Sequence, residues 1–163
     1  MARVLRLLCS GALWLTAGLA GCALPGRMPP DALQSDVQTR LGPPTATYAL
    51  ATGSRWQYSQ MPAGFEVHNL DFDAAGQLKH TEQVLTQQRL EQLAPGTSRH
   101  DVLTTFGAPM RVERVARFAG DIWTYRFRQL SDIRLAHIHL DPQGLVRQVL
   151  FTDELPNAND ARH

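Results

Sequence analysis

Trp123-Thr124-Tyr125-Arg126-Phe127-Arg128 alternates aromatic and polar side chains. A period of two places the three rings on one face of a β-strand and the polar side chains on the other. Trp56 and Tyr58 repeat the pattern between polar neighbours. We predict that the rings form the core face of a sheet covered by helices. The alternative is an exposed row of rings that binds a partner.

The chain repeats itself around these two strands. Six positions recur 65 residues later with the same residue types: Pro30, Asp36, Val37, Thr39, Gly42 and Pro44 correspond to Pro95, Asp101, Val102, Thr104, Gly107 and Pro109. The Trp-x-Tyr pair recurs 67 residues later, and an Asp-x-x-Gly turn recurs 68 residues later, as small loop insertions would produce. We therefore predict two tandem repeats, over residues 31–84 and 85–152, followed by a flexible tail over residues 153–163.

Each repeat is expected to open with a short helix. In the second repeat Thr97 or Ser98 can cap the helix start, and Asp101 is placed to complete a capping box. In the first repeat Asp31 is the expected cap, and a Gly-x-Pro sequence ends both helices. An additional helix is expected over residues 86–94. Because strands and tight turns follow each helix, the sequence predicts an α+β fold, with short helices packed on an antiparallel sheet of three or four strands in each repeat.

The N-terminus has the order of an export signal. Arg3 and Arg6 precede an apolar run that starts at Leu7, and small residues then lead to Cys22. From Leu7 to Cys22 the chain has 16 residues, which is fewer than the ~20 that a spanning helix needs. We predict a signal peptide over residues 1–21.

The tetrapeptide Leu19-Ala20-Gly21-Cys22 resembles the bacterial lipobox. The resemblance implies cleavage between Gly21 and Cys22, acylation of the cysteine, and a lipidated tether over residues 22–30. Ala23 follows the cysteine, and in lipoprotein sorting this residue implies the outer membrane rather than the inner one. Since Cys9 would leave with the signal, the mature chain is expected to form no disulfide.

Several short motifs of the second repeat carry a further resemblance. They are Pro95-Gly96-Thr97, Phe106-Gly107-Ala108-Pro109, Trp123-x-Tyr125-x-Phe127-Arg128-Gln129 and Asp141-x-x-Gly144. Together they resemble the SmpA/OmlA (BamE-like) family of outer-membrane lipoproteins, and the first repeat shows the resemblance weakly. Two such units in tandem also resemble the architecture of the β-lactamase inhibitor protein. The family resemblance implies no catalysis, and contacts with proteins or lipids of the cell envelope.

The composition and the short motifs exclude several classes of function. Lys79 is the only lysine and the formal net charge is +1, so no basic tract indicates nucleic acid. The sequence contains no nucleophile elbow, no phosphate-binding glycine loop and no cofactor motif. His137 and His139 are spaced so that both rings could reach one zinc ion, but a solvated polar face explains them better.

We expect the chain to be a non-enzymatic binding or scaffold factor in outer-membrane protein assembly or envelope integrity, on the periplasmic side of the outer membrane. Its expected partners are the membrane, through the lipid, and an envelope protein, for which the β-barrel assembly components are candidates; anionic lipid is a further candidate, and nucleic acid is not expected. Arg126 and Arg128 are the candidate partner-binding residues, because they lie opposite the aromatic face, where an acidic protein or anionic lipid could meet them. The alternative is a periplasmic inhibitor or sensor that binds an enzyme through its sheet face.

Overall fold

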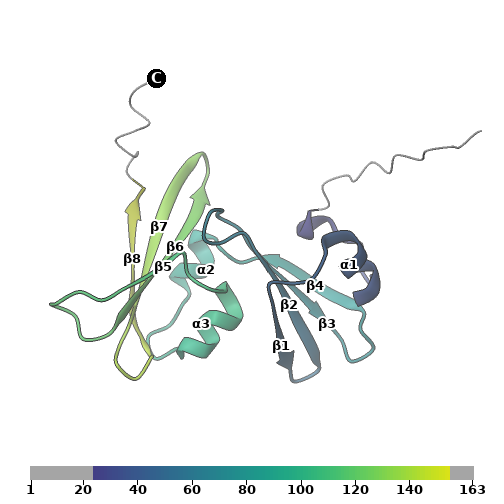
Figure 1. The fold of residues 1–163 in the computed structure, drawn as a ribbon, viewed down its shortest axis with the longest axis horizontal. Coiled ribbons are helices and arrows are strands. Elements are labelled where there is room, and N and C mark those ends of the chain that lie inside the picture. Colours follow the sequence, from purple (N-terminus) through teal and green to yellow (C-terminus); the bar gives the residue numbers. More distant parts are fainter. Residues whose placement is uncertain (1–23, 155–163) are drawn as a thin grey trace, which may run out of the picture.

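The computed structural model describes residues 24–154, which form two α+β units (Figure 1). The first unit consists of η1 (Pro25–Arg27), α1 (Gln34–Leu41), β1 (Ala46–Leu50), β2 (Gly53–Ser59), β3 (Val67–Phe72) and β4 (Leu78–Gln83). The second consists of α2 (Gln87–Glu91), α3 (Arg99–Phe106), β5 (Arg111–Glu113), β6 (Asp121–Gln129), β7 (Asp132–Leu140) and β8 (Val146–Asp153). Each unit has one antiparallel four-stranded sheet, in the orders β1-β2-β3-β4 and β5-β6-β7-β8. The predicted α+β class is confirmed.

The two units share local details as well as element order, consistent with the predicted tandem repeat. Both third strands carry a register shift at their last residue, between Asp71 and Phe72 and between His139 and Leu140. The Tyr58 hydroxyl donates to the Gly42 carbonyl at 3.0 Å, and its counterpart Tyr125 donates to the Gly107 carbonyl at 2.7 Å. In both units the strand tyrosine thus holds the end of the helix. The exact boundary between the repeats stays a prediction.

The aromatic residues of β6 lie in the core. Trp123 is 6% exposed, and Tyr125 and Phe127 are fully buried against α3, β7 and the linker at Val84 and Leu85. A smaller core forms where Val37 of α1 packs against the first sheet. The prediction that the rings form a core face rather than a binding platform is confirmed.

The helix starts show one correct prediction and one error. Ser98 is the N-cap of α3, and its Oγ accepts a hydrogen bond from the Asp101 amide at 3.1 Å. The expectation that Asp31 caps α1 is wrong, because the helix begins later and its N-cap is Leu33, which makes no side-chain hydrogen bond. Asp31 instead has φ +60°, and its carboxylate accepts a hydrogen bond from Lys79 Nζ at 2.7 Å. The predicted helix over residues 86–94 is present as the shorter α2.

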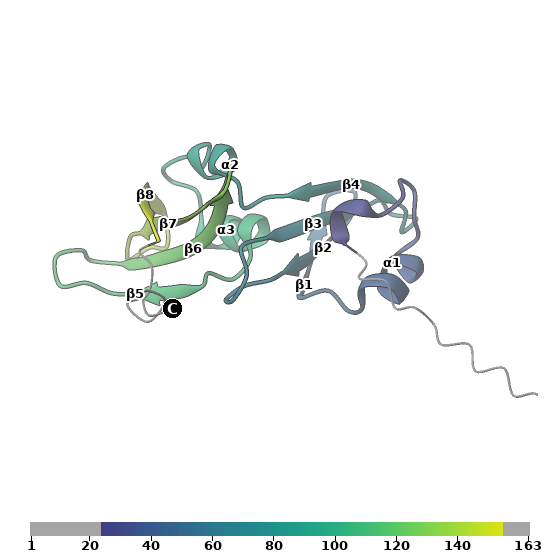
Figure 2. The same cartoon turned by 90° about the horizontal axis from the view of Figure 1, so that it is seen from above.

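Helix α3 lies between the two sheets in both views (Figures 1 and 2), and α1 covers the other face of the first sheet. The layers therefore run second sheet, α3, first sheet, α1. Cys22 and Gly21 lie outside the described residues. Within residues 24–154, no helix has the length and apolar character that crossing a bilayer requires.

Candidate interaction surfaces

The contact between the two units has an apolar part, where Val67 and Met61 join the core of the second unit, and a polar part centred on the C-terminal end of α3. Asn69 Nδ2 donates to the Thr105 carbonyl at 2.8 Å, and Gln57 Nε2 lies 3.4 Å from the carbonyls of Leu103 and Thr104. Both amide side chains are buried, at 2% and 1% exposure, and they are joined to each other by a 3.0 Å hydrogen bond. The last carbonyls of a helix have no partner within the helix and carry partial negative charge. The first sheet thus supplies the donors that cap this helix.

Two further side chains of the first sheet reach the same helix end. The Tyr48 hydroxyl donates to the Leu103 carbonyl at 3.3 Å, and Arg55 Nη1 donates to the Thr104 carbonyl at 3.4 Å. Arg55 is itself held by a bidentate ion pair with Asp71, at 2.7 and 2.8 Å. The alternation of residues in these strands predicts only that this face is polar. The feature that could have indicated a contact is the pair of uncharged amides, Gln57 and Asn69, on the face opposite the rings.

Asn69→Ala is expected to lower the free energy of unfolding by about 1–3 kcal/mol, because it leaves the buried Thr105 carbonyl without its donor and removes the 3.0 Å hydrogen bond from Gln57 Nε2. Urea denaturation followed by circular dichroism measures the loss. Gln88→Ala is the matched control, since that amide is on the exposed side of α2 and its truncation should change stability by no more than about 0.5 kcal/mol. Equal stabilities of the two variants would contradict the capping role of Asn69.

Arg126 and Arg128, the predicted partner-binding residues, both contact the loop between β2 and β3. Arg126 donates to the Ala63 carbonyl at 3.2 Å and forms an ion pair with Glu154. The Arg128 guanidinium lies 4.1 Å from the centre of the Phe65 ring, which is a cation–π contact. Charge reversal at these positions would therefore also remove contacts within the chain. Their role toward a partner stays a prediction.

The histidines of β7 lie on the outer face of the second sheet. His137 stands between two hydroxyls, with Nδ1 3.0 Å from Thr124 Oγ1 and Nε2 2.9 Å from Thr152 Oγ1. His139 packs edge-on against Phe118 with 4.9 Å between ring centres. Burial lowers the pKa of both imidazoles below their ordinary value and so favours their neutral form. Among residues 24–154, no cluster of three His, Cys, Asp or Glu side chains is arranged to hold a metal ion.

A cluster of arginines surrounds Asp121 at the start of β6. Arg114 Nε and Arg99 Nη2 lie 2.7 and 2.8 Å from its two carboxylate oxygens. The hydrogen bond from Arg114 holds the pKa of the Asp121 carboxyl below its usual range. Arg99 also lies over the Trp123 ring, 5.6 Å from its centre. Asp121 and Trp123 thus hold these arginines at the edge of the hydrophobic core of the second unit.

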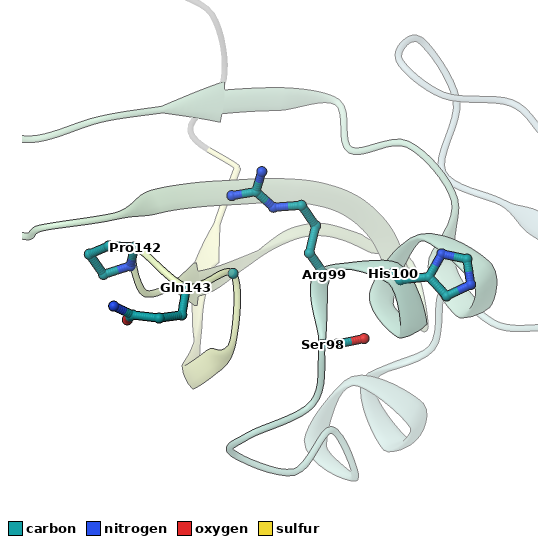
Figure 3. Close-up of a pocket in the computed structure, with 6 residues that line it drawn as sticks. Ser98, Arg99, His100, Pro142 and Gln143 are labelled. Carbon is teal, nitrogen blue, oxygen red and sulfur yellow. The ribbon is translucent and has the colours of Figure 1, made fainter.

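A hollow of about 240 Å³ lies beside this cluster, at the start of α3 (Figure 3). Ser98, Arg99 and His100 line it from the helix, and Pro142, Gln143 and Gly144 line it from the turn between β7 and β8. The labelled side chains do not point toward a common centre in Figure 3. Small-molecule sites depend on a few polar groups that converge on the ligand. This hollow does not have that arrangement.

The fold is that of a two-unit α+β protein, in which α3 of the second unit packs against the sheet of the first unit. Residues 82–149 match the family model described as the outer membrane protein assembly factor BamE domain. The second unit of this chain is therefore similar to the BamE domain family, a family of non-enzymatic assembly factors associated with the outer membrane. The resemblance predicted from the sequence is confirmed for this unit, and the match does not extend over the first unit.

No curated protein is significantly similar to the chain. One solved structure, a DUF4309 family protein (YjgB) from Bacillus subtilis, matches with 13% sequence identity and a TM-score of 0.31, over 76% of this chain and 79% of that one. A likeness of this size supports no argument about function.

Proposed function

We propose that the chain is an outer-membrane lipoprotein that faces the periplasm and acts as a binding factor in the assembly of β-barrel proteins. The observation that carries the proposal is the BamE domain match over residues 82–149. The lipobox at Cys22 and the following Ala23 support a lipid anchor in the outer membrane. The helix-capping contact between the units holds them together in one arrangement, as a scaffold requires. The alternative of an enzyme inhibitor or sensor is not favoured by the family match.

Co-purification tests the proposed partner. The full chain is captured from detergent-solubilised envelopes, and bound proteins are identified by mass spectrometry. We expect β-barrel assembly components in the captured material, at stoichiometric amounts that survive washing. Capture of a single soluble periplasmic enzyme in their place would overturn the proposal.

Cys22→Ala is expected to abolish acylation and to release the protein from the membrane fraction. Only a cysteine thiol accepts the first lipid, and several acyl chains at ~0.8 kcal/mol per buried methylene group supply the anchoring free energy. Intact-mass analysis and membrane fractionation measure both effects. Cys9→Ala is the matched control, because that residue lies in the predicted signal peptide and should leave the lipid and the fractionation unchanged. A wild-type mature mass without acyl groups would refute the anchor.

A further inference from the structure

The folded part of the chain begins very close to the predicted lipid site. The described residues start at Leu24, so Ala23 alone separates them from Cys22. The sequence predicts a lipidated tether over residues 22–30, and within this stretch Pro25–Arg27 forms the 3-10 helix η1, which contacts β3 and β4. The predicted lipid site is therefore joined to the first unit without a long linker.

Backbone hydrogen bonds fix the segment that follows η1. The Asp31 amide donates to the Leu78 carbonyl at 3.0 Å, and the Leu78 amide donates to the Ala32 carbonyl at 2.9 Å. Met28 packs against the small core of the first unit. At Gly26 the backbone runs beside His68, since a Cβ at this position would lie 3.5 Å from the imidazole Cε1. Residues 25–32 are thus part of the first unit.

The short connection limits how far the first unit can stand from a lipid on Cys22. An extended chain spans at most ~3.3–3.6 Å per residue, so the two steps from Cys22 to Leu24 reach about 7 Å. This reach is much shorter than the ~30 Å hydrocarbon core of a bilayer. It is also too short to hold a small domain clear of the bilayer surface. Since η1 belongs to the first unit, the surface around it must lie at the membrane.

We propose that the surface formed by residues 24–30 is a docking face for the lipid bilayer, and that the second unit is directed away from the membrane. The inference rests on the proposed acylation of Cys22. In both views η1 and α1 lie at one end of the molecule, and the loop between β5 and β6 lies at the opposite end (Figures 1 and 2). The BamE domain is therefore presented to the periplasm while the first unit serves as its base on the membrane.

The chemistry of the docking face suits a bilayer surface. Leu24 is an apolar side chain that is 49% exposed, and Arg27 is exposed beside it. An apolar group next to a cation can insert shallowly while the cation meets anionic headgroups. Lys79 lies close to Asp31 and Asp73, at 2.7 and 3.4 Å, so its charge is largely balanced.

Single-cysteine labelling tests the orientation on the lipidated protein. Acylated Cys22 has no free thiol and Cys9 is removed, so a cysteine placed at residue 27 or residue 117 is the only reactive one. Arg27→Cys puts the label on η1, and Arg117→Cys is the matched variant on the exposed loop between β5 and β6. Each variant carries a fluorophore in phosphatidylethanolamine–phosphatidylglycerol vesicles that contain a headgroup-quencher lipid. We expect quenching to be several-fold stronger at residue 27.

Insertion of a flexible linker supplies the second arm of the test. A Gly/Ser segment of about twenty residues between Ala23 and Leu24 has a root-mean-square span of about 25 Å, and it should reduce quenching at residue 27 severalfold. Equal quenching at both positions, stronger quenching at residue 117, or no change on insertion would each overturn the proposal. Intact mass is measured on the same samples, so an absent acyl group is recognised as a failure of the proposed anchor and not of the orientation.

Discussion

Trp123→Ala is expected to lower the free energy of unfolding by about 3–5 kcal/mol, the cost of removing a large aromatic side chain from a packed core. The indole is 6% exposed, and it lies on the same sheet face as its cross-strand neighbours Val112 and Ile138. Its replacement leaves a cavity under α3 and removes the ring over which Arg99 lies. Urea denaturation followed by far-ultraviolet circular dichroism measures the loss without depending on tryptophan fluorescence.

Val112→Ala is the control for the Trp123 variant. Val112 pairs with Trp123 across the β5–β6 ladder, yet its side chain is 52% exposed because β5 is a short edge strand. Truncation of an exposed side chain changes stability by about 0.5 kcal/mol or less. A loss below ~1 kcal/mol for Trp123→Ala would show that the indole is not part of the core, and would return it to consideration as a contact for partners.

Gly120→Ala is expected to destabilise the second unit by more than about 3 kcal/mol. The residue has φ +146°, and a Cβ would lie 2.0 Å from the carbonyl oxygen of Leu140. Unfavourable dihedrals alone cost on the order of 1–3 kcal/mol, and here the clash with backbone adds to that cost, because the strands must separate to relieve it. The same expectation holds at Gly53 in the first unit, with φ +142° and 1.9 Å to the Phe72 carbonyl oxygen.

Gly96→Ala separates the two contributions. Gly96 also has a positive φ, +88°, but nothing lies within 4 Å of a Cβ built there. The Gly96→Ala variant should therefore lose only the free energy that the unfavourable backbone dihedrals cost, about 1–2 kcal/mol. The midpoints of denaturation give the comparison directly. If Gly120→Ala costs no more than Gly96→Ala, the close approach of the β5–β6 loop to β7 is not a constraint on the fold.

Much of the fold could be predicted because its signals are local. Alternation in β6 gave the core face, and the Gly-x-Pro and Asp-x-x-Gly positions gave the ends of the helices and the turns. The start of α1 was misjudged because Asp31 has the side chain of an N-cap but pairs with Lys79, a residue distant in sequence. N-cap preferences reflect hydrogen bonds between a side chain and the neighbouring backbone. A carboxylate that instead pairs with a residue distant in sequence does not cap the helix.

The contacts between the units were harder to predict. Gln57 and Asn69 have no periodic or motif-like spacing, and their partners are backbone carbonyls some 36 to 47 residues away. Arg126 and Arg128 were correctly placed opposite the rings, but no sequence pattern indicated that the β2–β3 loop reaches them. Contacts between units depend on how the whole units are arranged in space. Local periodicity in the sequence contains no information about that arrangement.

The end of a helix is ordinarily where it frays first, since its last carbonyls have no partner in the helix. In this protein the last turn of α3 is enclosed by side chains of the other unit. Loss of that turn would therefore remove these hydrogen bonds between the units, and separation of the units would expose the end of the helix to fraying.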